Sequence, residues 1–308
     1  MKVNWDDLPR DQWAQLHARE WGALQQSWAY GDALASLEVR VLRAMVWQDD
    51  QLVAIAQFIC KRIAGYISLA SCTRGPVWQP DLQPQQRAEV YRLLRQSMPL
   101  PRLRVVLFSP DREESEVDAA ESKGMHRVMT GYSTVMLDLR PPLDSLKAGF
   151  EGKWRNRLNK ALANEKIRVQ VQASVKRCEW LMGQEMAQRE AKKFHGLPTA
   201  FVSAYIAAST EPRLAFLVAY AEYGKDTVAA MLFLIHGAVA SYHMGWSSEQ
   251  GRQLNAHNLL MWKLMAHAQS MGLEALDLGG VNTHDLPGIS RFKLGTGGRV
   301  LRLAGTFF

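Results

Sequence analysis

Apolar and polar positions follow two different periods along the first half of this chain. Short apolar or alternating runs bounded by polar turns predict strands at residues 38–47, 52–62, 66–70, 103–108 and 133–139. Apolar residues at helical spacing predict helices at residues 11–35, 83–98 and 113–122. Pro141-Pro142 then ends the last strand and is the clearest domain boundary, because consecutive prolines interrupt regular pairing.

The second half repeats this order of elements. The same patterns predict strands at residues 167–171, 214–220, 228–235, 239–246, 275–278 and 300–307. Helices are predicted at residues 143–164, 178–194, 200–209 and 258–271. A chain of 308 residues favours two domains, which we expect at 1–142 and 143–308. The predicted fold class is α+β, with mixed β-sheets flanked by helices in each half.

Composition is that of an ordinary globular protein, with 47% hydrophobic and 22% charged residues. No run reaches the ~18 uncharged apolar residues of a membrane span, and the first residues do not resemble a signal peptide. The three cysteines, Cys60, Cys72 and Cys178, show no paired spacing. We therefore expect a reduced, cytoplasmic protein. The eight histidines show no ligand spacing, so no metal site is expected.

Charge is distributed unevenly. Residues 1–150 carry 18 Lys and Arg against 18 Asp and Glu, whereas residues 151–308 carry 19 against 12. Residues 152–164 contain no acid and include Lys153, Arg155, Arg157 and Lys160. This predicts either a surface for a polyanionic partner or a solvated helix face.

The most informative motif lies near the C-terminus. Asp277 and Leu278 end a predicted strand at Gly279 and Gly280, whose missing Cβ lets a ligand approach the backbone. Lys293 follows in a short, largely apolar and Gly-rich run. A cation in such a setting often faces a developing negative charge. The pattern indicates acyl transfer rather than a metal site, a P-loop or a nucleophilic triad.

Three stretches resemble the FemABX-like aminoacyltransferases. Residues 24–31 (LQQSWAYG) and 74–77 (RGPV) are similar to the family's N-terminal motifs. Residues 153–161 (KWRNRLNKA) resemble its basic helix start, and the tail with DLGG at 277–280 and GISRFK at 288–293 resembles its ending. The resemblance implies two tandem domains of the GCN5-related N-acyltransferase (GNAT) fold. The sequence has no heptad-patterned insertion, so the long coiled-coil arm of the larger members is not expected.

The resemblance also implies a reaction. An amino acid would move from aminoacyl-tRNA to an amine of a peptide, a peptidoglycan precursor or a small molecule, and the product would be an amide. An aminoacyl ester is already activated, so direct aminolysis needs orientation and a stabilised oxyanion but no covalent nucleophile and no cofactor. The expected partners are thus the charged tRNA and the amine-bearing acceptor.

Two residues are predicted to be catalytic. Lys293 would stabilise the oxyanion, or the phosphate and terminal ribose near the ester; the alternative is an exposed lysine on a strand. Asp277 would orient or deprotonate the acceptor amine, or else it satisfies backbone N–H groups of the following turn, a common use of Asp.

The predicted binding residues are cations, aromatic side chains and glycines. They are Lys153, Arg155, Arg157, Lys160, Arg74, Tyr242, Trp246, Phe292, Gly279 and Gly280. The four cations of residues 153–160 would bind phosphates. Arg74 either reaches substrate or pairs with a surface acid. Tyr242 and Trp246 either line an acyl or nucleobase pocket or pack in the core.

Two other functions compete. An acyl-CoA-dependent GNAT N-acyltransferase would need a pyrophosphate-binding loop, and residues 247–256 (SSEQGRQLNA) carry only a degenerate form of its pattern. A non-catalytic RNA- or peptide-binding module would keep the fold without the chemistry, and the presence of Lys293 disfavours it.

Overall fold

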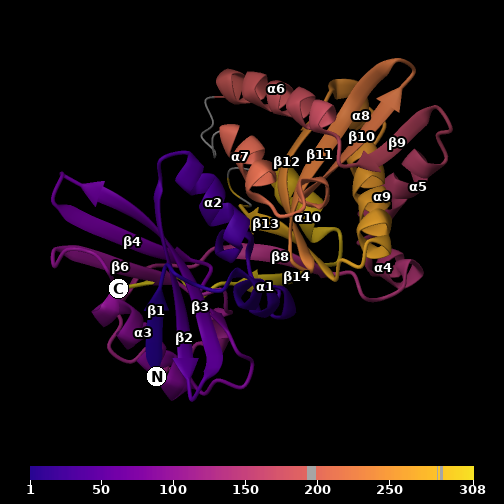
Figure 1. Ribbon diagram of the computed structural model, residues 1–308. Coiled ribbons are helices and arrows are strands. Elements are labelled where there is room, and N and C mark those ends of the chain that lie inside the picture. The colour runs from indigo at the N-terminus through magenta and orange to yellow at the C-terminus, as the bar shows by residue number, and fades with distance from the viewer. Residues whose placement is uncertain (193–198, 283, 285–286) are drawn as a thin grey trace. The chain divides into compact units, whose positions relative to one another are not determined.

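The computed structural model describes residues 1–192, 199–282, 284 and 287–308, and it divides into two compact units (Figure 1). The first unit is Met1–Ser133 with Leu301–Phe308, and the second is Thr134–Val300. These units differ from the predicted ranges 1–142 and 143–308 at both ends. Strand β8 (Ser133–Asp138) joins the sheet of the second unit, whereas β15 (Thr306–Phe307) joins that of the first.

The first unit is built on one mixed sheet. Its strands run in the order β1-β2-β3-β4-β6-β15-β7, with β5 paired to β3. The bounds are β1 Lys2–Trp5, β2 Arg40–Gln48, β3 Gln51–Ile63, β4 Ile67–Thr73, β5 Val77–Trp78, β6 Arg104–Ser109 and β7 Arg127–Met129. Strands β2, β3 and β4 form an antiparallel meander, and helix α3 (Pro84–Ser97) precedes β6, which pairs parallel to β4.

The second unit repeats this topology. Its sheet has the order β14-β8-β13-β12-β11-β10-β9. The bounds are β9 Ile167–Gln172, β10 Phe216–Tyr223, β11 Asp226–His236, β12 Val239–Ser247, β13 Ala275–Val281 and β14 Arg299–Arg302. Strands β10, β11 and β12 form the meander, and helix α9 (Ala256–Ser270) connects β12 to the parallel strand β13. The predicted duplication of an α+β arrangement is confirmed.

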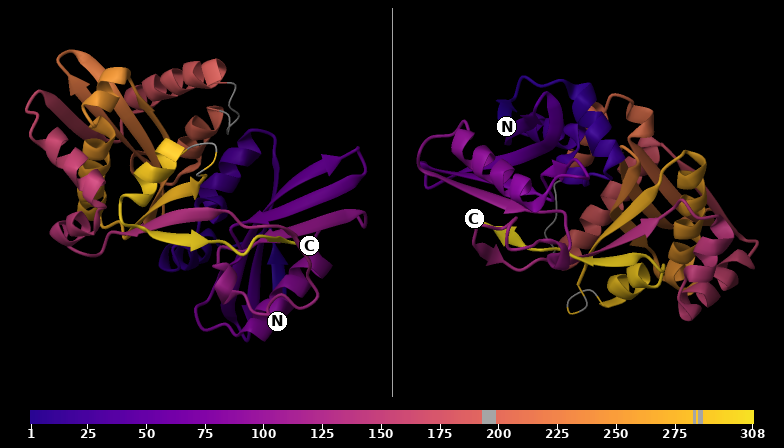
Figure 2. Two further views of the ribbon diagram at one scale, coloured as in Figure 1. Left: turned by 180° about the vertical axis from the view of Figure 1, so that it is seen from behind. Right: turned by 90° about the horizontal axis from the view of Figure 1, so that it is seen from below.

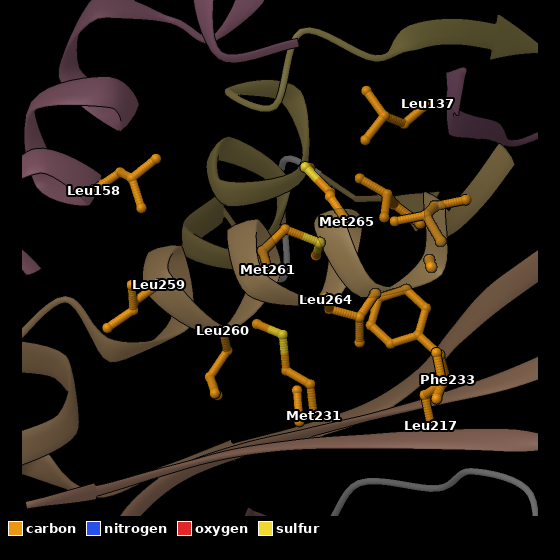
Figure 3. Close-up of a cluster of buried hydrophobic side chains, with 14 of the residues drawn as sticks. Leu137, Leu158, Leu217, Met231, Phe233, Leu259, Leu260, Met261, Leu264 and Met265 are labelled. Atoms are coloured by element: carbon orange, nitrogen blue, oxygen red, sulfur yellow. The ribbon is translucent and has the colours of Figure 1, made fainter. Parts of the chain in front are cut away.

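Helices cover both faces of the second sheet (Figures 1 and 2). They are α4 (Leu143–Gly149), α5 (Gly152–Leu162), α6 (Val175–Lys192), α7 (Ala200–Ala208), α8 (Glu249–Gln253), α9 and α10 (Pro287–Leu294). Helix α9 carries Leu260 and Leu264 toward Met231 and Phe233 of the sheet, while Leu158 of α5 joins the same cluster (Figure 3). This apolar stripe at i and i+4 explains why α9 packs where it does.

Three helix predictions are wrong in detail. The helix expected at residues 11–35 is α1 (Arg10–Arg19), a 3-10 turn and α2 (Trp28–Ser36), because Trp21 adopts a positive φ and Ser27 caps a new helix. The helix expected at 143–164 is split at Phe150, which has an extended backbone. The acidic run 113–122 forms only a 3-10 turn at Glu114–Glu116. Residues 193 and 194 of the helix expected at 178–194 lie outside the described residues.

The strand expected at 300–307 is two strands in different sheets, β14 and β15. The three cysteines are buried and unpaired with one another, as small core residues. Among the described residues, no helix is long and apolar enough to cross a membrane.

Candidate active site

The site lies in the second unit, where β12 and β13 stop pairing as parallel neighbours. Their parallel register runs from Val239 opposite Ala275 to Ser241 opposite Asp277. The next residues, Tyr242 and Leu278, line a cavity of about 520 Å³. A β-bulge in β12 sharpens the divergence, because Phe233 and Leu232 of β11 pair with Tyr242 and Met244, leaving an extra residue between them. The cavity thus opens at the point where the sheet splits.

Lys293 is buried in the wall of this cavity, on α10. Its side chain is 8% exposed, and Nζ donates a hydrogen bond to the Gly280 carbonyl oxygen at 2.8 Å. Nζ also lies 5.5 Å from the centroid of the Tyr242 ring. Burial lowers the pKa of Lys293, while the negative charge of Asp277 opposes this shift. The alternative of an exposed strand lysine is therefore wrong.

Asp277 is also buried, and its Oδ1 accepts two hydrogen bonds. One comes from Thr134 Oγ1 at 2.9 Å and the other from the Gly279 backbone N–H at 2.8 Å. Gly279 has φ +72°, a conformation that other residues rarely adopt. Asp277 therefore satisfies a backbone N–H two residues further along the chain, as one of the two alternatives required, although Gly279 still lies within β13 (Ala275–Val281) and not in a turn after it. A direct role of Asp277 toward the acceptor amine stays a prediction.

Two substitutions of Asp277 separate these roles. Asp277→Ala leaves the Thr134 hydroxyl and the Gly279 N–H without their acceptor, so we expect it to lose about 1–3 kcal/mol of unfolding free energy. Asp277→Asn keeps an oxygen for both donors, and we expect nearly wild-type stability in urea unfolding. A stable Asp277→Asn protein whose turnover falls by about a hundredfold or more would instead assign the carboxylate a part in proton transfer.

The two aromatic residues of β12 that were predicted to bind a ligand, Tyr242 and Trp246, lie in different environments. Tyr242 lines the cavity, and its pKa is raised to about 12 by burial and by the nearby Glu185 carboxylate. Trp246 packs edge-to-face against Trp180 of α6 with ring centroids 5.3 Å apart. Its carbonyl oxygen lies 3.0 Å from His257 Nε2. Tyr242 is thus placed to meet a ligand, and the Trp246 ring serves packing.

The cations of α5 do not share one face. Lys153, Arg157 and Lys160 are exposed at helical positions i, i+4 and i+7, and we call them the α5 stripe. Arg157 also lines the cavity. Arg155 is half-buried and donates to the Ala148 carbonyl oxygen at the end of α4, at 3.2 Å. Three of the four predicted phosphate-binding cations are therefore presented together to solvent.

The remaining predicted residues divide between the two units. Phe292 lines the cavity, and its carbonyl oxygen accepts from Trp154 Nε1 at 3.0 Å. Gly280 supplies the carbonyl that holds Lys293.

Arg74 belongs to the first unit, where it is buried and donates from Nε to Asp111 Oδ1 at 2.7 Å. Of its two alternatives, pairing with an acid is correct, although the pair is largely buried.

Sequence reasoning missed two cavity residues at the start of α9, His257 and Asn258. The His257 ring lies 6.0 Å from that of Phe292, and its pKa is lowered by burial, with a further contribution from the positive charge of Arg252. Asn258 is buried, and its amide nitrogen donates no hydrogen bond within the described part of the chain. No local pattern marks either residue, because only the crossover from β12 into α9 brings them to the cavity.

The described residues contain no group of three or more His, Cys, Asp or Glu side chains that could hold a metal ion. The cavity instead combines a buried cation, a phenol, an imidazole and an amide with apolar walls from residues such as Met261 and Leu278. Such a set can bind an acyl group, stabilise an oxyanion and accept a proton.

Residues 150–294 match the family described as an acetyltransferase (GNAT) domain. A crystal structure of FemX is similar over 99% of this chain and 96% of its own, with a TM-score of 0.83 and 14% identity. The C-terminal domain of a putative lysylphosphatidylglycerol synthetase from Agrobacterium fabrum has a TM-score of 0.58 at 12% identity, covering 97% of this chain and 92% of its own.

A tandem GNAT protein from the clavulanic acid biosynthesis pathway has a TM-score of 0.52 at 13% identity and covers 99% of this chain and 98% of its own. No curated protein sequence matches this chain. The chain has the FemABX-like tandem GNAT fold, without a coiled-coil arm among the described residues. The fold and the matched domain together support an acyltransferase.

Proposed function

We propose that this protein transfers an amino acid from aminoacyl-tRNA to the amine of a peptide, peptidoglycan precursor or small molecule. The observation that carries the proposal is the buried Lys293 ammonium in the wall of the cavity where β12 and β13 diverge. The similarity of the whole fold to FemX supports the choice of donor class.

The chemistry of aminolysis matches this cavity. When the amine attacks the ester carbonyl, negative charge develops on the carbonyl oxygen, and a cation in a partly desolvated site stabilises it strongly. Lys293 is anchored by Gly280, so its ammonium needs little reorganisation during the reaction. Tyr242 forms part of the neighbouring wall and limits where the acyl group can lie.

The α5 stripe supports a polyanionic donor. Its three cations are exposed on one helix face, and Arg157 connects that face to the cavity. Each phosphate contact releases counterions on binding, so affinity falls with salt by a log–log slope of about −0.7 to −0.9 per contact. We place the acceptor stem of the tRNA along the α5 stripe, with its aminoacyl end in the cavity.

A binding experiment tests this placement. We expect the protein with Lys153, Arg157 and Lys160 all changed to Gln to bind charged tRNA more weakly, with a salt slope reduced by about two to three. A matched control changes three exposed lysines elsewhere, Lys61, Lys225 and Lys263, to Gln. Equal slopes for wild type and both variants, measured by filter binding from low to moderate salt, would remove the α5 stripe from the tRNA site.

An assay matrix tests the donor itself. Wild-type protein is incubated with charged tRNA pools or with a panel of acyl-CoAs, and amide products are detected by mass spectrometry with and without RNase. We expect RNase-sensitive product from charged tRNA. The cavity is also lined by residues from the stretch 247–256, which corresponds to a pyrophosphate loop. An acyl-CoA donor is therefore the alternative that this assay tests. RNase-insensitive product from an acyl-CoA would replace the proposed donor.

A further inference from the structure

The imidazole of His257 forms part of the wall of the cavity that Lys293 also lines. His257 lies in the first turn of α9 and packs against Phe292, the residue that precedes Lys293 on α10. Both His257 and Lys293 line the same cavity of about 520 Å³. A substrate bound in this cavity could therefore contact both an imidazole that moves a proton and an ammonium that stabilises an oxyanion.

One hydrogen bond determines which nitrogen of His257 is basic. Nε2 lies 3.0 Å from the Trp246 carbonyl oxygen. A carbonyl oxygen only accepts hydrogen bonds, so Nε2 carries the proton, and the lone pair of the neutral ring is on Nδ1. Nδ1 has no hydrogen-bond partner among the described residues. The ring is thus oriented, with one nitrogen left to act as a base.

The charges around His257 favour its neutral form. Burial lowers its pKa, and Arg252 of α8 lowers it further, while the bond to Trp246 opposes both. Among the described residues, Arg157 of α5 and Lys293 of α10 are the other cations that line the cavity, and Tyr242 of β12 is its phenol. Glu185 of α6 acts on Tyr242. At neutral pH the imidazole can therefore accept a proton.

The adjacent Asn258 adds an unsatisfied hydrogen-bond donor to the same cavity wall. Its side chain is 5% exposed, and its amide nitrogen is buried without an acceptor in the described part of the chain. Leaving such a donor unsatisfied is unfavourable. A carbonyl oxygen of a bound substrate would satisfy it.

We propose that Nδ1 of His257 takes a proton from the attacking amine and returns it to the departing ester oxygen. This inference rests on the proposed function. The neutral amine nitrogen bonds to the carbonyl carbon, and the charge on the carbonyl oxygen faces Lys293. His257 then accepts the proton from that nitrogen. When the carbon–oxygen ester bond breaks, the same proton passes to the leaving oxygen, so the cycle balances without another reactant.

His257→Gln is the discriminating variant, because its amide can still donate to the Trp246 carbonyl but offers no basic nitrogen. We expect turnover to fall by about a hundredfold or more, with unchanged unfolding in urea. His267→Gln, near the other end of α9, is the matched control and should keep wild-type turnover. The donors are a charged tRNA pool and acetyl-CoA, and the acceptor amines are an Ala-Lys dipeptide and hydroxylamine.

A spectroscopic measurement reads the state of His257 independently of the donor. In 15N NMR of histidine-labelled protein, the signals lost in His257→Gln should show a protonated Nε2 and an unprotonated Nδ1 at neutral pH. A protonated Nδ1, or a folded His257→Gln protein within about threefold of wild-type turnover, would overturn the proton-transfer role.

Failure of the proposed tRNA donor can be distinguished from failure of the proposed role of His257. Transfer from acetyl-CoA alone would remove the tRNA donor, yet the ratio of wild type to His257→Gln would still decide the role of His257, since a thioester also needs the amine proton removed. Wild-type protein that transfers nothing from either donor to either amine would overturn both proposals.

Discussion

Lys293→Met is expected to fold like the wild type and to lose about two orders of magnitude in turnover, the usual cost of removing one oxyanion donor. Methionine retains most of the aliphatic stem that packs in the cavity wall but cannot offer an ammonium. Steady-state kinetics with charged tRNA at saturating acceptor would measure the effect.

The loss should appear in kcat rather than in substrate binding. The negative charge on the carbonyl oxygen exists only in the transition state, so an interaction with it leaves ground-state affinity almost unchanged. Lys293 is also held by the Gly280 carbonyl at 2.8 Å, which fixes its position before substrate arrives. We therefore expect the Kd of charged tRNA to stay within about threefold of the wild-type value.

A matched lysine controls for a general loss of positive charge. Lys263 is exposed on α9, and Lys263→Met should keep wild-type turnover. Equal kinetics for Lys293→Met and Lys263→Met would show that the buried cation does not take part in the reaction. Loss of urea stability in Lys293→Met alone would assign Lys293 a structural role.

Most helices and strands are predictable from the sequence, because turn residues and apolar periodicity are properties of short stretches of chain. The polar residues around Asp49 and Asp50 predicted the β2–β3 hairpin, and both adopt the positive φ that such a turn requires. The apolar stripe of α9 likewise predicted its buried face. The duplicated order of elements was then sufficient to predict a repeated α+β fold.

The sheet that β8 or β15 joins is not predictable from the sequence, because it depends on pairing with strands far away in the chain. Strand β8 was predicted at nearly its observed position, but its membership of the second sheet depends on its neighbours β13 and β14, more than 130 residues later. Pro141-Pro142 therefore indicated the end of a strand correctly without indicating where one unit ends. Similarly, β15 lies beside β6 because of pairing between Phe307 and Phe108.

Some residues of the candidate site belong to a local sequence motif, whereas others come together only through the fold. Asp277, Gly280 and Lys293 lie in one recognisable tail, although the helix that carries Lys293 is not predicted from the sequence, because Pro287 at its first position begins a helix of only eight residues. His257 reaches the cavity only through the crossover between β12 and β13. For its Nε2 partner, Trp246, the sequence left both a pocket role and a packing role open, and the structure shows its ring packed against Trp180.

Trp154→Ala is expected to have the largest effect on stability, at about 3–5 kcal/mol of unfolding free energy. Trp154 lies on α5, is 3% exposed and packs against Phe150 with ring centroids 4.4 Å apart. Alanine would leave a cavity in a close-packed region, where the neighbouring side chains relax only partially. Urea unfolding followed by circular dichroism would measure the loss.

The same substitution should also reduce turnover, because Trp154 fixes the helix that carries Lys293. Its Nε1 donates to the Phe292 carbonyl oxygen, and the Glu151 backbone N–H donates to the Gly295 carbonyl at 3.0 Å, so α5 and the end of α10 are joined at two points. A displacement of a catalytic group by about 1 Å can cost up to a hundredfold in rate. We expect a fall of between roughly tenfold and a hundredfold in kcat under conditions where the variant is fully folded.

Trp154→Phe separates packing from hydrogen bonding. Phenylalanine retains most of the ring contacts but leaves the Phe292 carbonyl without its donor, at a cost of about 1–3 kcal/mol. If α10 is positioned mainly by that hydrogen bond, Trp154→Phe should lose nearly as much turnover as Trp154→Ala while remaining considerably more stable. If packing positions the helix, turnover should follow stability through the series. Full turnover in a folded Trp154→Ala protein would show that Lys293 is held by Gly280 and α10 alone, without support from α5.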